Sequence, residues 1–228
     1  MIKLLDGKLP DFPLSAGLVR IQSLYRSYGT SFDFLRFYYQ IVDDKITAIM
    51  SIMDGNATLV DNNADYEEII DFLEVIGAET VYSEGKLPLE IIDNGYIVKK
   101  SVAPIEVLSN NCNLTIVYDI MSTSFQLPDF NAWYPDMSHR IRHDGAIAIL
   151  NDNGAAIGLK GDNGALISGI CVSENFRKKG LGSLILQELI DNLSVGEIFA
   201  LVDVNGPISF YTKNGFSIVS EFSTYKVK

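Results

Sequence analysis

The stretch SENFRKKGLGS (173–183) decides the fold, because it joins two segments of different periodicity. Before it lies an apolar run, GALISGICV (164–172), and after it LILQELIDNL (184–193) has the apolar spacing of a helix. Three adjacent cations (177–179) therefore stand at a helix start, where the dipole already contributes roughly half a positive charge. This placement becomes favourable when an anion binds among them.

Two glycines make the same stretch suitable for a ligand. Gly180 and Gly182 allow a tight turn and a close approach to the main chain. The free N–H groups of the helix, from about Lys179 to Ser183, would then point at the anion. Phosphate fits better than carboxylate, because several donors and cations converge. The alternative is an exposed basic turn whose glycines serve only the bend, and the strand–loop–helix context favours the phosphate site.

Composition bounds the class of protein. The chain has 228 residues, 47% hydrophobic, and a net charge of −11, which argues against a nucleic-acid partner. Cys112 and Cys171 lie far apart, so we expect no disulfide framework or structural zinc, and Cys171 reads as a buried thiol. The start of the chain lacks the apolar core of a signal peptide, and no apolar stretch is long enough for a membrane span. We therefore expect a soluble, cytoplasmic protein.

The order of elements suggests an internal duplication. Strands expected at 34–42, 46–53 and 57–60 precede a helix at 64–76 and a strand at 79–83. The second half repeats this order, with the strands, helix and strand expected at 146–150, 155–160, 165–172, 181–193 and 197–204. Unrelated α/β proteins also contain such joints, so the duplication is a hypothesis.

The two halves differ where the strand joins the helix. The first half uses VDNNAD (60–65) and lacks the basic, glycine-rich segment. The pattern weakens around 104–117, which predicts two domains, 1–114 and 115–228. A helix is also expected at 14–28, and two short helices at 118–125 and 131–142.

Two motifs together resemble a known family. Arg177-x-x-Gly180-x-Gly182 resembles the acyl-CoA pyrophosphate loop of the GNAT superfamily of N-acetyltransferases, whose signature is Q/R-x-x-G-x-G/A. NGPISFYTKNGF (205–216) resembles the N…FY…xGF segment of that family, and a helix and a strand separate the two motifs. The resemblance covers roughly 118–228, and the N-terminal half is similar only in element order. It implies an α/β fold with a mixed, mainly antiparallel sheet in tandem GNAT-like halves.

The resemblance also implies where acetyl-CoA would bind. The strand ending at Val172 would diverge from the strand 197–204, main-chain groups of Ile170 and Val172 would bind pantetheine, and the loop would bind pyrophosphate. The expected cofactor residues are Ile170, Cys171, Val172, Arg177, Lys178, Lys179, Gly180, Leu181, Gly182, Ser183 and Asn205.

Two of the matched residues have alternative roles. Tyr211 matches the family's tyrosine that protonates the departing thiolate, and a phenol with a pKa of ~10 can donate at neutral pH. Its alternative role is to pack a helix at 207–213 against the sheet. Asn205 is one residue closer to Tyr211 than the family's asparagine is to its tyrosine, and it also suits the N-cap of a helix beginning at Gly206-Pro207.

The general base has no obvious candidate. Some family members carry a glutamate on the strand before the loop, and that position is Leu166 here. Both histidines lie nearby in sequence, in WYPDMSHRIRH (133–143), expected to line the acceptor side. The tentative acceptor residues are His139, Arg140 and Arg142, with His139 as a base, and the alternative is a set of solvated charges at a helix end. His139 and His143 could chelate a metal, but a third ligand is lacking beyond Asp136 or Asp144, so we expect none.

The sequence thus predicts acetyl transfer from acetyl-CoA to a primary amine of a small-molecule or peptide acceptor. A non-catalytic acyl-CoA-binding or sensing protein is the alternative, motivated by Leu166, and a nucleotide-binding protein is the third interpretation. Neither a nucleic acid nor a membrane is expected as a partner. The acceptor, the acyl chain length and the oligomeric state, including a homodimer, stay open.

Overall fold

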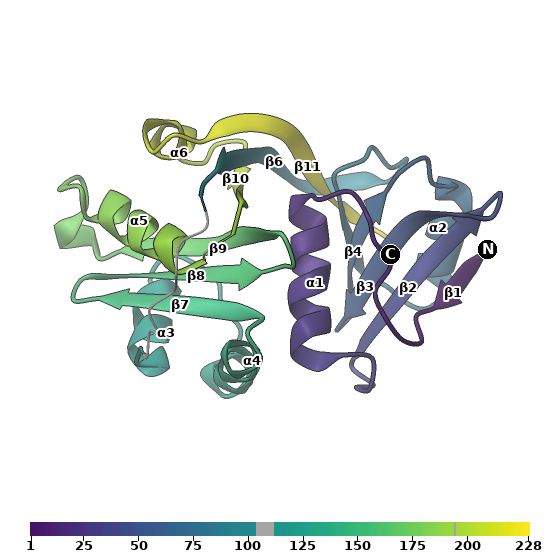
Figure 1. Ribbon diagram of the computed structural model, residues 1–228, viewed down its shortest axis with the longest axis horizontal. Helices are drawn as coiled ribbons and strands as arrows, with labels where there is room; N and C mark the ends of the chain where they lie inside the picture. Colours follow the sequence, from purple (N-terminus) through teal and green to yellow (C-terminus); the bar gives the residue numbers. More distant parts are fainter. Residues whose placement is uncertain (104–111, 194) are drawn as a thin grey trace.

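The computed structural model describes residues 1–103, 112–193 and 195–228. Within these residues, eleven strands form one mixed sheet, and six α-helices pack around it (Figure 1). The strands are β1 (Ile2–Leu4), β2 (Leu35–Val42), β3 (Lys45–Met53), β4 (Asn56–Asp61), β5 (Thr80–Ser83), β6 (Glu90–Ser101), β7 (Ala146–Asn151), β8 (Gly154–Lys160), β9 (Gly164–Val172), β10 (Glu197–Asp203) and β11 (Ser217–Lys226). The helices are α1 (Ala16–Tyr28), α2 (Tyr66–Val75), α3 (Leu114–Ser122), α4 (Phe130–Arg142), α5 (Leu181–Leu193) and α6 (Ile208–Lys213), with a 3₁₀ turn η1 (Glu174–Phe176).

The repeated element order is confirmed. In each half, three antiparallel strands (β2–β3–β4 and β7–β8–β9) lead into a helix, α2 or α5. The strand after that helix, β5 or β10, runs parallel to the last strand of the three. The sheet order is β1-β2-β3-β4-β5-β11-β6-β10-β9-β8-β7, so the predicted α/β class with a mixed sheet is also confirmed.

Two long strands, β6 and β11, join the halves, and the sequence did not predict either. β6 pairs with both β10 and β11, and β11 also pairs with β5 of the first half. Asn94-Gly95 is a dipeptide typical of turns, yet it lies inside β6. The strand needs a glycine at position 95, because a Cβ there would come 2.2 Å from the Val202 carbonyl oxygen. The predicted division into 1–114 and 115–228 stays a prediction, and its junction at 104–111 lies outside the described residues.

Helix α1 stands between the two halves (Figure 1). Ser15 caps its start, accepting a hydrogen bond from the Leu18 N–H. From its second half, Arg26 forms ion pairs of 3.0 Å with Asp144 and Asp162 of the C-terminal half. The Ser23 hydroxyl donates to the Gly145 carbonyl at 2.7 Å, so α1 fixes the second half against the first.

Helix α3 begins earlier than predicted. Its first residue is Leu114, because the Asn113 side chain accepts from the Thr115 and Ile116 N–H groups at 3.0 and 3.4 Å. The prediction placed the helix start at 118 because it treated the whole asparagine-rich stretch before it as a loop.

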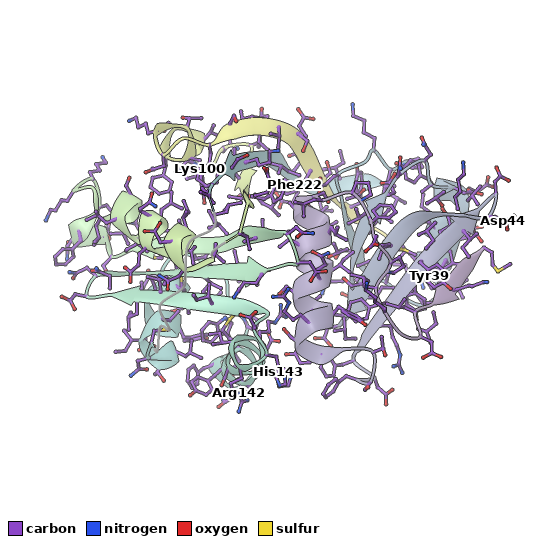
Figure 2. All side chains as sticks on the ribbon, in the orientation of Figure 1. Tyr39, Asp44, Lys100, Arg142, His143 and Phe222 are labelled. Carbon is purple, nitrogen blue, oxygen red and sulfur yellow. The ribbon has the colours of Figure 1, made fainter. Side chains whose placement is uncertain are left out.

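Helices cover the C-terminal sheet on both faces. The buried side chains of α5 share helical spacing and form one apolar cluster with β7–β10, whereas α3 and α4 pack on the opposite face; on α5 they are Ile185, Leu186, Leu189, Ile190 and Leu193. Each such side chain contributes ~1.5–3 kcal/mol by its burial, which holds the start of α5 beside the end of β9. Phe222, labelled in Figure 2, lies on β11. It stacks on Tyr82 of β5 with ring centroids 5.7 Å apart. None of the described helices is long and apolar enough to cross a membrane.

Candidate active site

The parallel pair β9–β10 opens partway along its length. Its pairing runs from Gly164 opposite Glu197 to Ile167 opposite Ala200. Beyond that point β9 continues on β8 as far as Val172, whereas β10 continues on β6 as far as Asp203. A bulge marks the opening, because Ile167 and Gly169 pair with adjacent residues of β8 and leave Ser168 between them. The strands therefore diverge after Ile167, as predicted.

A cavity of about 400 Å³ lies at this opening. Its walls come from the end of β9, the loop before α5, the first turn of α5 and the start of α6. The lining residues are Ile170, Val172, Arg177, Lys178, Gly180, Gly182, Ser183, Pro207, Phe210 and Tyr211.

The loop before α5 is held by its own arginine. Arg177 Nε donates to the Val172 carbonyl at 3.0 Å, and its Nη2 donates to Ser124 Oγ at 3.1 Å. Lys178 adopts a left-handed φ of 61°, and Lys179 Nζ lies 5.1 Å from the centroid of the Phe176 ring. Arg177 thus fixes the loop to the end of β9, and Lys178 is the lysine of the loop that lines the cavity.

The start of α5 presents its main chain to the cavity. Gly180 has a φ of 83°, a region that favours glycine, and the helix begins at the next residue. A Cβ at Gly182 would lie 3.3 Å from the Phe210 ring, so a larger side chain here would crowd a residue that lines the cavity. The first N–H groups of a helix lack intrahelical partners, and here they combine with the positive charges of the loop into an anion-binding end.

Tyr211 forms the far wall of the cavity. The residue is 8% exposed, and its ring contacts Phe210 and Phe216 edge-on at 5.1 and 5.5 Å. Burial raises the pKa of its phenol to about 12, so the hydroxyl is protonated at neutral pH. It can donate a proton and also packs α6 on the sheet, so both predicted roles fit its position.

A second, larger cleft of about 620 Å³ lies between the two halves. One wall comes from α1 and the β3–β4 hairpin, and the other from α4 and β8–β10. The polar lining residues are Arg20, Ser51, Asp54, Asn56, Thr58, Asp136, Arg140 and Ser168, and the others are Leu24, Met53, Leu127, Pro128, Trp133, Met137, Leu159, Leu166, Ile167 and Leu201. Ser168 lines this cleft and Ile170 lines the first cavity, so both open on the same stretch of β9.

The comparisons with known proteins agree with this geometry. A family model described as "Acetyltransferase (GNAT) domain" matches residues 141–218, which span β7 to the start of β11 and include the loop, α5 and Tyr211. This part of the chain is similar to the GNAT acetyltransferase domain family. The predicted family resemblance is therefore confirmed.

Solved structures extend the likeness in fold to most of the chain. A tandem GNAT protein from the clavulanic acid biosynthesis pathway has a TM-score of 0.55 at 10% identity, over 90% of this chain and 87% of that one. A GCN5-related N-acetyltransferase from Sphaerobacter thermophilus has a TM-score of 0.59 at 12% identity, over 93% and 90%. One from Kribbella flavida has 0.59 at 13%, over 92% and 93%. These identities show the GNAT fold alone, and a comparison with curated proteins found no match to the chain.

The GNAT loop lies as predicted, but other predicted cofactor residues lie elsewhere. Lys179 and Leu181 belong to the loop and α5 but are not among the residues that line the cavity. Cys171 points to the opposite face of β9, where its thiol is 3.3 Å from the Ile120 carbonyl, so the predicted buried thiol is confirmed. Sequence reasoning did not assign Pro207 and Phe210, although both lie in the second GNAT motif.

The predicted N-cap role of Asn205 is wrong. Helix α6 begins at Ile208, its cap residue is Pro207, and no side chain caps it. The Gly206 N–H instead donates to the Asp203 carbonyl at 2.7 Å, which closes a turn and delays the helix. Asn205 is exposed and does not appear among the lining residues.

The predicted acceptor residues of α4 divide into two groups. Arg140 lines the cleft. His139 Nε2 lies 2.8 Å from the Ser27 carbonyl, which only accepts, so this nitrogen carries the hydrogen, and the ring stacks on Tyr28 at 4.6 Å. Arg142 Nε donates to the Ser138 carbonyl at 3.2 Å at the end of α4 (Figure 2). His139 and Arg142 thus lie outside the cleft lining.

Proposed function

We propose that the protein transfers the acetyl group of acetyl-CoA to a primary amine. One observation carries the proposal: the cavity beside the basic loop and the cleft between the halves both open on β9, within residues 167–170. The cavity lies on the α5 face of the sheet and the cleft on the α4 face, so a group held at Ile170 would reach a second molecule at Ser168 through the gap between β9 and β10 that opens after Ile167. A donor in the cavity and an acceptor in the cleft could therefore meet.

The residues of the cavity fit the parts of acetyl-CoA. The pyrophosphate would lie on the start of α5, with Lys178 and the N–H groups of Gly180, Leu181 and Gly182, because the Ser183 N–H already donates to the Gly180 carbonyl at 3.1 Å. Pantetheine would lie along the edge of β9 that faces β10, whose pairing ends at Ile167. When bound, acetyl-CoA supplies an acetyl thioester, a reactive donor.

The chain's own groups would then guide charge and protons. A β9 main-chain N–H at the opening would stabilise the negative charge that develops on the carbonyl oxygen. As the C–N bond forms and the C–S bond breaks, Tyr211 would donate its phenolic proton to the sulfur. The amine would lose one proton to solvent, and Tyr211 would take up one proton from solvent, so the enzyme returns to its starting state.

The amine proton has no dedicated acceptor on β9. Leu166 is 3% exposed and brings no carboxylate. Asp136 accepts from the Tyr28 hydroxyl and from Arg140 Nε, so its charge is already engaged. Asp54 is exposed at the β3–β4 hairpin. We infer that the amine reacts from its neutral form and that its proton passes to water in the cleft.

This inference predicts a pH profile. We expect kcat/KM to rise with pH up to the pKa of the free amine, because the neutral fraction of the amine then sets the rate. Two acceptors of different pKa, measured over the same pH range, should reach their plateaus at different pH. A shared plateau near pH 7 would instead indicate a base on the enzyme.

The buried Leu166 also favours a second candidate function, a non-catalytic acyl-CoA-binding protein. The two are separated by CoA release from acetyl-CoA in the presence of an amine panel, with the protein-free reaction as the baseline. CoA release above that baseline, with a matching acetylated amine by mass spectrometry, supports transfer. CoA binding without release on any amine supports the sensor.

We expect one CoA per chain, because the first half fills its own equivalent site. Asp65 caps α2 with its own carboxylate, and Glu68 pairs with the N-terminal amine at 2.7 Å. Beside the end of β4, the Gly17 N–H of α1 donates to Glu84 at 2.7 Å, and a Cβ at Gly17 would lie 2.9 Å from Val60. Calorimetric titration with CoA should give a single site, and two sites per chain would contradict this reading.

A further inference from the structure

Two guanidinium groups from different helices face the cleft between the halves. Arg20 comes from α1 and Arg140 from α4, and both line the cleft. They are close enough that the positive charge of Arg140 lowers the pKa of Arg20, although burial of Arg20 is the larger cause. Tyr82 and Glu84 act in the opposite direction. The pair places two guanidinium groups in the cleft, whose lining also includes Asp136, paired with Arg140, and the exposed Asp54.

Arg20 has no ion-pair partner in the part of the chain that the structure describes, residues 1–103, 112–193 and 195–228. Its Cζ lies 4.6 Å from the centroid of the Tyr82 ring, which orients the guanidinium plane. The nearby Glu84 carboxylate accepts from the Gly17 N–H at 2.7 Å. A stacked, partly buried arginine without an ion-pair partner among the described residues is arranged to receive an anion from outside.

Arg140 uses only part of its guanidinium within the protein. Its Nε donates to Asp136 at 2.9 Å, and its side chain is 14% exposed. Its Nη2 lies 3.9 Å from the sulfur of Met53, a weak acceptor. The Asp136 pair fixes the direction of the side chain, and the Nη2 end is not held by a strong acceptor.

We propose, resting on the proposed function, that the acceptor amine also carries an anionic group, a carboxylate or a phosphate, bound by Arg20 and Arg140. The guanidinium fork matches both groups in geometry. The volume of about 620 Å³ suits a small molecule rather than a protein surface. Trp133, Met137 and Leu24 supply apolar walls for its body, and Ser168 marks the wall nearest the donor cavity.

The test compares amines in matched pairs. Phenylalanine is paired with phenylalaninamide, and phosphoethanolamine with ethanolamine, so that each pair removes one anionic group. Because this removal also lowers the pKa of the amine, kcat/KM is compared per neutral amine. We expect the anionic member of at least one pair to have a kcat/KM about 10- to 100-fold higher, the range for one charge-assisted contact. The pair that responds identifies carboxylate or phosphate.

Variants assign the preference to the two arginines. Arg20→Gln and Arg140→Gln should each remove most of the preference through KM, while CoA affinity stays unchanged. Arg20→Lys keeps the charge without the planar fork and should retain part of the preference for the anionic amine. This variant also tests the inference if Arg20→Gln folds poorly. Arg36→Gln, the same change at an exposed site of the first half, is the control.

Binding to the CoA-saturated protein, measured by calorimetry with the same four amines, separates this inference from acetyl transfer. Transfer without any preference for the anionic members overturns the inference and leaves the proposed function standing. Selective binding of an anionic member, lost in both glutamine variants but without transfer, supports the inference and overturns the proposed function. If neither the binding nor the transfer is selective for an anionic member, the inference is overturned.

Discussion

Replacing Tyr211 by phenylalanine should lower kcat by ~10²–10⁴-fold while CoA affinity changes little, as expected for the loss of a general acid. The substitution removes only the hydroxyl, so the edge-on contacts with Phe210 and Phe216 are kept. Steady-state kinetics on any amine that the wild type accepts, together with CoA binding by calorimetry, measures the two effects separately. A pKa of about 12 means that the wild-type phenol is available as a donor throughout the neutral range.

Two further variants separate the acid role from packing. Tyr211→Ala should destabilise the fold by ~3–5 kcal/mol, because it empties a buried aromatic site between α6 and the sheet. Tyr39→Phe on β2 repeats the hydroxyl loss away from the site and should leave kcat unchanged (Figure 2). If Tyr211→Phe turns over at the wild-type rate, Tyr211 is a packing residue, and the thiolate takes its proton from water or from the amine.

Local patterns predicted the elements and the cofactor loop. The apolar runs of β2–β4 and β7–β9 and the apolar spacing on α5 depend on a few neighbouring residues, and the structure has these elements within two residues of the predicted bounds. β6 and β11 escaped prediction because their pairing joins the two halves, and the packing of Gly95 against β10 is visible only in three dimensions.

The cleft between the halves could be predicted only in part for the same reason. Arg140 lay in a stretch singled out for its charges, whereas Arg20 is one of several polar positions on an amphipathic helix. The role proposed for Arg20 depends on Tyr82 and Arg140, which are distant from it in sequence. Asn205 failed as a cap because the turn at Gly206 moved the helix start, a shift that cap propensity does not encode.

The second large effect concerns the start of α5. Gly182→Glu should weaken CoA binding by ~100-fold or more, because it puts a carboxylate where the phosphate would accept hydrogen bonds from the helix N–H groups. A Cβ at Gly182 lies 3.3 Å from the Phe210 ring, and the backbone needs no left-handed φ there, so the fold should persist. Calorimetry with CoA gives the affinity, and thermal unfolding checks the fold.

Two control variants separate charge from size. Gly182→Ala adds only a methyl group and no charge, so it should bind CoA far better than the glutamate variant. Gly196→Glu makes the same charge change in open space before β10, where no atom lies within 4 Å of a Cβ, and should bind as the wild type does. If Gly182→Glu keeps the wild-type affinity, the pyrophosphate does not lie on this helix start, and the cationic loop must serve another purpose. If Gly182→Ala loses as much affinity as Gly182→Glu, close approach to the main chain matters more than charge, because the methyl group alone then suffices to displace the ligand.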